Sequence, residues 1–402
     1  MKSEAGEIER RFAARLASVV MGIDALARRP GAVPAVFGEV KVVPLFNGGA
    51  LIEPRDYVTW EDAAADVADL DPEALPAGPR RAFSVAMRAS MRAALRMFCG
   101  ETLTFSEKMT ELVGAPADPA AWRITAQCHE AIDLSLRRLG FVSGDLAVRL
   151  AAWEAARAVA PGDVAGLFKE LCVEAKRRTT AHIFDTGDYA MELTPVHGVT
   201  YTARCGFSAR RVQLNMDIAF TRAALKQLVC HEIFPGHATQ MLSTRAAAEE
   251  GRSGHDALLC AANAAPGCVQ EGIGDQAAEL IGWIEDEDDV LYGTLKRLRN
   301  AEQAAAAWRL MEEGGAEADV ARELKTRAFG QDAWIKGRLA MARHPFNGPF
   351  ITSYFAGDEC VRTLRARLAP AELPAFTATL FEDVHSLSSL GLFGARDPVQ
   401  TA

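Results

Sequence analysis

A proline–glycine pair at positions 235 and 236 interrupts a segment that otherwise has the pattern of a helix. The segment follows Thr221, a good N-cap residue, and runs through RAALKQLVCHEIF with an apolar stripe that includes Leu225 and Val229. Proline lacks a backbone N–H and clashes with the carbonyl four residues earlier, and glycine allows turns that other residues resist. The helix must therefore break or bulge after Phe234.

Two histidines flank this break, in the stretch VCHEIFPGHATQ at 229–240. Zinc peptidases commonly carry H-E-x-x-H on one helix, where the histidines bind the ion and the glutamate is the base. Here His237 follows His231 by six residues, and in an unbroken helix the two would point roughly 120° apart. A break at the Pro-Gly pair would let His237 face His231, which is compatible with chelation. The alternative is a helix end at which Glu232 pairs with a lysine or arginine.

A third metal donor is available in CVQEGIGDQAAELIGW, residues 268–283, which has the pattern of a helix preceded by a second Pro-Gly pair. The predicted buried face of this helix consists of Ile273, Ala277, Leu280 and Ile281. Glu271 shares its own face with Gly274 and Ala278, which leave room for an ion and an approaching helix. The alternative is a solvated glutamate, which the macrodipole favours near a helix start.

Helical periodicity dominates the rest of the 402-residue chain, with helices predicted at 3–28, 80–98, 119–139, 145–158 and 163–179. Two stretches favour β-structure: 35–53, with an Asn-Gly turn, and 196–216, where 199–202 is the predicted hairpin partner of 212–216. We therefore expect a mainly α fold with a small β-hairpin or sheet beside the metal-binding helix. No repeat or linker divides the chain, so residues 1–402 are predicted to form one domain. Its helical part would cover about 1–190 and its metal-site part about 191–402.

Composition argues against several functional classes. The net charge is −9 without blocks of like charge, which disfavours nucleic acid or an anionic membrane as a partner. The sequence has no apolar run of about 18 residues and no secretory h-region at its start. Eight cysteines without C-x-x-C spacing fit a reducing cytoplasm and are expected to be small core residues. The expected partner is therefore a small molecule or short peptide, and the expected location is cytoplasmic; the oligomeric state does not follow from the sequence.

Together these motifs resemble the DUF885 family, bacterial and predominantly helical proteins identified with zinc peptidases of gluzincin-like mechanism. The family pattern H-E-x-x-P-G-H-x-x-Q is matched in full from His231 to Gln240, and the start of its E-G-W-x-x-Y is matched by Glu271-Gly272. A late Ser-Tyr-x-x-Gly is matched by 353–357, and LTFSEKMTELVG at 103–114 is similar to the family's N-terminal half. The first motif is highly specific, the others are individually weak, and the resemblance covers about residues 80–400. It implies a large helical, zincin-like domain.

The chain also departs from the family pattern. Where the family has E-G-W-x-x-Y-x-E, this chain has Ile273, Gln276 and Ala278, and Phe350 replaces a glutamine that usually lies four residues before the tyrosine. The predicted metal ligands are kept while neighbouring positions, expected to face the substrate, are altered. These departures point to a retained metal centre with a non-standard substrate.

The resemblance implies metal-assisted hydrolysis. His231, His237 and Glu271 would hold the ion, for which zinc suits the donor set best while cobalt, manganese and iron stay open. Glu232 would act as general base, and Tyr354 would donate to the developing oxyanion. Five further residues are candidates for substrate binding: His197, Asn215, Gln240, Arg343 and His344. A structural role is the alternative for His197, and an ordinary surface role is the alternative for Arg343 and His344.

Two other functions stay open at this stage. One is a metalloenzyme of the same fold that performs C–N or C–O cleavage, elimination or rearrangement on a small metabolite. The other is a binding protein without catalysis, although a metal-binding shell alone would have no need of a base at Glu232.

Overall fold

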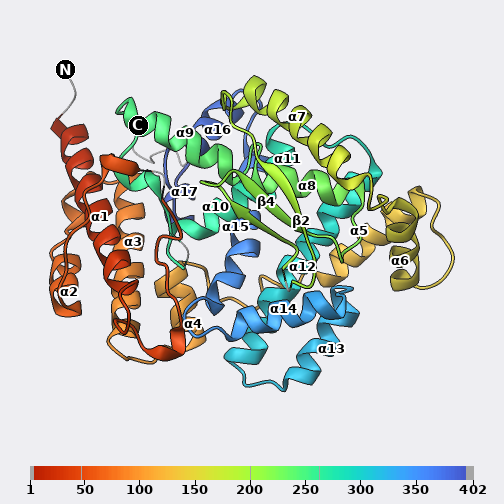
Figure 1. Ribbon diagram of the computed structural model, residues 1–402, viewed down its shortest axis with the longest axis horizontal. Coiled ribbons are helices and arrows are strands. Elements are labelled where there is room, and N and C mark those ends of the chain that lie inside the picture. The colour runs from red at the N-terminus through yellow and green to blue at the C-terminus, as the bar shows by residue number, and fades with distance from the viewer. Residues whose placement is uncertain (1–3, 47, 200, 262, 395–402) are drawn as a thin grey trace, which may run out of the picture. The chain divides into compact units, whose positions relative to one another are not determined.

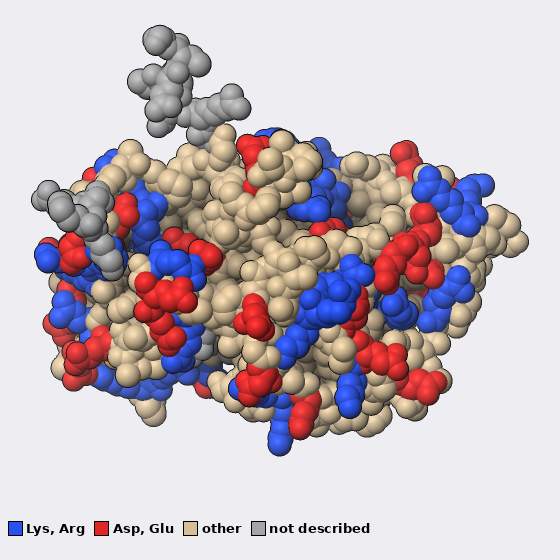
Figure 2. Space-filling view, turned by 90° about the horizontal axis from the view of Figure 1, so that it is seen from above, with Lys and Arg blue, Asp and Glu red and all other residues tan. Residues whose placement is uncertain are grey.

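The computed structural model describes residues 4–46, 48–199, 201–261 and 263–394, and helices make up most of it (Figure 1). The predicted fold class, mainly α with a small sheet, is confirmed. Within these ranges, none of the helices combines the length and apolar character that crossing a membrane demands. Basic and acidic side chains are interspersed over the face drawn in Figure 2.

The described chain divides into two compact units, each assembled from separate segments. The first unit comprises 1–117, 241–272 and 345–402, and the second comprises 118–240 and 273–344. The prediction of one domain, with a helical part up to about residue 190 and a metal-site part after it, stays a prediction. Each unit combines segments that are distant along the chain. A change of composition along the sequence therefore cannot reveal where one unit ends and the other begins.

The first unit is helical, and most of its apolar core packs around α1 and α3. Its longer helices are α1 (Glu4–Ala27), α2 (Trp60–Ala68), α3 (Pro79–Phe98), α15 (Ser353–Arg367) and α16 (Leu373–Glu382). Its short elements are η1 (Ala35–Phe37), η2 (Gly49–Leu51), η3 (Pro72–Ala74), α4 (Phe105–Glu107), η4 (Lys108–Val113), η5 (His255–Leu258), η6 (Gly348–Thr352) and α17 (Leu387–Leu390). Strands β1 (Leu45–Phe46) and β5 (Leu259–Cys260) form one antiparallel pair.

The second unit combines helices with a three-stranded sheet. Its helices are α5 (Thr125–Arg138), α6 (Leu146–Arg157), α7 (Val164–His182), α8 (Arg222–Glu232), α11 (Ala277–Leu280), α12 (Glu287–Met311), α13 (Glu317–Arg327) and α14 (Asp332–Arg343). The sheet has the order β2-β4-β3, from β2 (Glu192–Val196), β3 (Ala203–Gly206) and β4 (Arg211–Asn215). Strand β4 pairs parallel with β2 and antiparallel with β3.

Two helices cross from one unit to the other: α9 (His237–Glu249) begins in the second unit, and α10 (Pro266–Asp275) ends in it. Each of the two carries one of the predicted metal ligands, His237 and Glu271 respectively.

The sequence predicts the helices better than the strands. The five predicted helices correspond to α1, α3, α5, α6 and α7, although α5 starts six residues later than predicted, after a turn at 119–122. The predicted β-stretch 35–53 contains only two strand residues among those described, and the predicted Asn-Gly turn includes Asn47, which lies outside the described residues. The hairpin partner of β4 is 203–206 rather than 199–202, and β4 also pairs in parallel with β2 on its other side.

Three of the eight cysteines, Cys128, Cys230 and Cys268, are buried as the sequence analysis expected. Cys99 is exposed and the other four are half-buried, so the expectation was wrong for most of them. None of the eight forms a disulfide.

Candidate metal centre

The Pro-Gly pair lies in a turn that separates helix α8 from helix α9. Helix α8 begins after the N-cap Thr221, whose side chain accepts a hydrogen bond from the Ala224 N–H, and it ends at Glu232. A new helix, α9, starts at His237, and the four residues between them include a cis peptide bond before Pro235. A Cβ atom on Gly236 would overlap the carbonyl of His231, so the chain can fold back at this point only with glycine there.

This turn places the two histidine rings against each other. The ring centroids of His231 and His237 lie 4.8 Å apart, and their planes are nearly perpendicular at 83°. The helix break at the Pro-Gly pair predicts this approach, and the ring geometry agrees with it.

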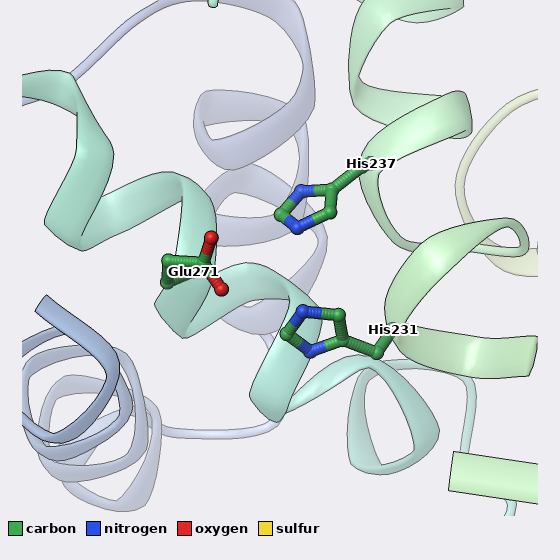
Figure 3. Close-up of side chains that lie close together, drawn as sticks. All are labelled: His231, His237 and Glu271. Carbon is green, nitrogen blue, oxygen red and sulfur yellow. The ribbon is translucent and has the colours of Figure 1, made fainter. Parts of the chain in front are cut away.

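Glu271 completes a cluster of three potential metal donors. Each residue offers one ligand atom, and these atoms from His231, His237 and Glu271 lie within 4.8 Å of one another. Figure 3 shows the three side chains pointing toward one another, with the histidines at the α8–α9 junction and the glutamate on α10. His231 and Glu271 are each 8% exposed, and His237 is half-buried. Burial of a carboxylate beside two imidazoles favours a bound cation, because the charge is otherwise poorly solvated.

Contacts inside the second unit fix α10 against the histidine junction. A Cβ atom on Gly274 would lie 2.8 Å from Nδ1 of His231, so the absent side chain lets the imidazole pack directly on the helix. Glu271 lies one helical turn earlier on α10, and side chains three residues apart share a helix face. The small residue predicted to leave room beside Glu271 therefore accommodates one of the histidines.

Asp275 holds His231 in position. The Asp275 Oδ1 atom lies 2.9 Å from Nδ1 of His231 and 2.6 Å from Nζ of Lys296, while Asn300 donates to its Oδ2 at 2.7 Å. Burial alone would raise the pKa of Asp275, but the positive charge of Lys296 and the hydrogen bond with His231 lower it to about 2. Asp275 is thus a carboxylate, and Nδ1 of His231 lies between its Oδ1 atom at 2.9 Å and Nζ of Lys296 at 3.3 Å. A carboxylate behind a ligating imidazole is a recurrent partner in metal sites.

The predicted base, Glu232, lies next to the edge strand β3. It is half-buried, and it shares a hydrogen bond with the thiol of Cys205 on that strand. Burial, together with the charge of Glu232, raises the pKa of the Cys205 thiol well above its ordinary value, so the thiol stays protonated and donates. Just beyond β3, the ring of Phe207 meets that of His237 edge to face, with centroids 6.4 Å apart.

Tyr354 belongs to a helix that packs closely on α10. A Cβ atom on Gly272 would overlap the carbonyl of Gly357, and one on Gly357 would overlap the carbonyl of Cys268. Helices α10 and α15 therefore cross in backbone contact at the two motif glycines, inside the first unit. This crossing sets Tyr354, in the first turn of α15, on the helix that packs beside Glu271.

The other predicted substrate-binding residues have different surroundings. His197 is largely exposed and pairs with Asp217 at 2.7 Å, and Arg343 forms a surface ion pair with Glu317. The Asn215 amide donates to the carbonyls of Val199 and Tyr201, so it closes the loop between β2 and β3.

Gln240 and His344 are less exposed. Gln240 is buried in the first turn of α9, where its backbone N–H donates to the carbonyl of Gly236. His344 caps the end of α14, and burial lowers its pKa. None of these five residues belongs to the three-donor cluster found among the described residues.

Sequence reasoning missed three residues that contact the site: Asp275, Lys296 and Cys205. A signal existed for Asp275, because it follows Glu271 by one helical turn and is acidic on a helix predicted to be buried. Lys296 and Cys205 come from α12 and β3, and nothing in their local sequence points to α8.

The donor set fits a divalent transition ion. Two imidazoles and one carboxylate suit zinc, and three protein ligands are typical of a catalytic rather than a structural zinc site.

Comparison with known proteins shows likeness of fold. No family model and no curated protein matches the chain. A "putative lipoprotein" from Colwellia psychrerythraea has a similar structure, with TM-score 0.57 and 14% identity over 78% of this chain and 59% of the other. A "putative lipoprotein of unknown function" from Shewanella oneidensis has TM-score 0.54 and 15% identity over 87% of this chain and 71% of the other. The chain thus spans less than two thirds of the Colwellia protein, and at these identities the likeness concerns the fold alone.

Proposed function

We propose that this protein is a metal-dependent hydrolase, with zinc the preferred ion, that cleaves an amide or peptide-like bond of a small substrate. The observation that carries the proposal is the convergence of ligand atoms from His231, His237 and Glu271 within 4.8 Å. Glu232, the proposed base, directly follows His231 in the chain. The resemblance of the motifs to DUF885 proteins supports the same chemistry.

Each residue has a distinct task in this proposal. His231, His237 and Glu271 would hold the ion. A divalent ion bound there would lower the pKa of a coordinated water and polarise a carbonyl. Glu232 accepts a proton from the attacking water and delivers it to the leaving nitrogen. Tyr354 donates its phenolic hydrogen to the oxyanion that develops on the substrate.

Metal titration tests the site without any substrate. Purified protein, stripped with a chelator and titrated with Co²⁺ or Zn²⁺, should bind about one ion per chain, and alanine at His231, His237 or Glu271 should abolish tight binding. His197→Ala is the matched control, because this histidine is exposed and paired with Asp217. Wild-type protein that takes up no ion would overturn the proposal.

Hydrolysis is tested with the zinc-loaded protein on a mass-resolved panel of dipeptides, acylated amino acids and small amides. Glu232→Gln is the reference variant, because it should keep the ion while turnover falls by about a hundredfold or more. Equal turnover by this variant and the wild type would remove Glu232 from its role.

A further inference from the structure

The ring of Phe350 packs on the helix that carries Glu271. Phe350 lies in η6, just before α15, and it is half-buried. A Cβ atom on Gly267 would lie 2.8 Å from Cε2 of Phe350, so the ring fills the space that a side chain at position 267 would occupy. Phe350 therefore covers α10 at Gly267.

Gly267 and Glu271 share one face of α10. They are four residues apart, and Cα–Cβ bonds on a helix tilt toward its N-terminus. The side chain of Glu271 thus leans toward Gly267, where the Phe350 ring lies. The ring and the carboxylate are neighbours along the same helix face, and all three residues belong to the first unit.

Tyr354 extends this aromatic surface. The rings of Phe350 and Tyr354 have centroids 5.8 Å apart with planes at 73°, an edge-to-face arrangement. Both residues are half-buried rather than enclosed in the core. One apolar ring and one hydroxyl-bearing ring therefore stand side by side next to a metal ligand.

We propose that Phe350 is a specificity-determining residue, and that the substrate carries an aromatic or bulky apolar group next to the bond that is cleaved. This inference rests on the proposed function, because it assigns a role relative to a bound ion. Contact between the Phe350 ring and an apolar substituent of the substrate removes apolar surface from water, which favours binding. If the substituent is aromatic, the ring pair adds an attraction beyond the effect of the buried area. Tyr354 then addresses the reacting carbonyl while Phe350 contacts its substituent.

The test uses two chelators that share a metal-binding group and differ in their tails. Acetohydroxamate carries a methyl group and benzohydroxamate a phenyl ring, and calorimetry on the zinc-loaded protein gives both affinities, each corrected by the affinity for aqueous zinc. In the wild type, benzohydroxamate should bind about tenfold more tightly or better, as burial of an aromatic ring predicts. Phe350→Gln should reduce this preference to about threefold or less and leave acetohydroxamate affinity within about twofold.

Two control variants keep the experiment specific. Phe12→Gln makes the same change at a half-buried ring on α1 and should keep the preference for the phenyl tail. Tyr354→Phe should weaken both probes equally, so their ratio stays unchanged. Circular dichroism checks folding, and if Phe350→Gln does not fold, Phe350→Leu replaces it, with the preference expected to fall about threefold.

The outcomes separate the two proposals. If neither hydroxamate binds the zinc-loaded wild type, the proposed metal site fails and the role of Phe350 fails with it. If both bind but without a phenyl preference, or if Phe350→Gln keeps that preference, the assignment of Phe350 is overturned while the proposed hydrolase stands.

Discussion

The two regions that supply the three potential metal donors are built in opposite ways. At the α8–α9 junction, both histidines come from seven consecutive residues, and a glycine that admits no side chain folds one ring onto the other. On α10, Glu271 lies on a regular helix, and packing places that helix: Gly272 on Gly357, and Gly274 on His231. Local chemistry therefore positions the histidines, whereas contacts between distant segments position the glutamate.

This difference explains what the sequence could predict. Thr221 as N-cap, the end of α8 near the Pro-Gly pair and the approach of His237 to His231 all depend on short-range rules. Glu271 was identified as a candidate, but the packing of its neighbour Gly272 on Gly357 depends on which helices pack together. The same holds for the contacts of His231 with Asp275 and Lys296. Local patterns give no such information.

The same division applies to the fold. Helices with strong periodicity, such as α1 and α3, were predicted within a few residues. The composition of 35–53 led to a wrong prediction of β-structure, because valine-rich segments also form buried irregular structure. Val40, Val42 and Val43 lie in the main core outside any strand. The sheet order β2-β4-β3 includes a parallel pair that a hairpin rule does not anticipate.

The largest effect is expected at the junction. Gly236→Ala forces the new Cβ against the His231 carbonyl, so the turn must open and the imidazoles must separate. Zinc affinity should fall on the order of a thousandfold, because one of the three ligands no longer contributes to binding. The free energy of unfolding should drop by about 1–3 kcal/mol. Competition with a chromophoric chelator and thermal melts measure the two effects.

Gly293→Ala is the matched control for that variant. Gly293 lies within α12 with open space around its Cβ position, so alanine should leave zinc affinity unchanged and stabilise the helix by up to about 1 kcal/mol. If Gly236→Ala behaved like this control, the junction would not depend on its local chemistry.

Gly274→Ala addresses the packing side of the comparison. Its Cβ would lie 2.8 Å from Nδ1 of His231, so the ring must shift away from α10 and from Asp275. We expect zinc affinity to fall by about a hundredfold, because ligand orientation is lost although all three donors remain. Gly166→Ala in α7, with nothing near its Cβ position, should change affinity by less than about twofold. An unaltered affinity in Gly274→Ala would mean that the histidine junction does not depend on α10.

Asp275→Asn probes the hydrogen bond behind His231 with almost no change of shape. Asparagine keeps the shape of the side chain but lacks the charge beside the imidazole, so zinc affinity should fall by about tenfold. The control is Asp289→Asn, which removes another buried carboxylate paired with a lysine, Lys226 at 2.5 Å. Both variants should lose stability, and only the first should lose zinc affinity. Parallel losses of affinity would show that the effect is general destabilisation.

The smallest effect tests whether the locally built region also depends on a distant contact, the bond between Cys205 and Glu232. The charge of Glu232 raises the pKa of the Cys205 thiol, so Glu232→Gln should lower that pKa and increase the thiolate fraction at a given pH. Since the thiolate is the nucleophile, alkylation by iodoacetamide in metal-free protein at pH 8 should accelerate by up to about tenfold for each unit of pKa. Peptide mapping resolves Cys205 from the exposed Cys99, whose rate should be the same in both proteins and serves as internal reference. Burial remains in the variant, so Cys205 should still react more slowly than Cys99. Equal Cys205 rates in wild type and variant would mean that strand β3 does not hold Glu232, and the junction would then be positioned by its own sequence alone.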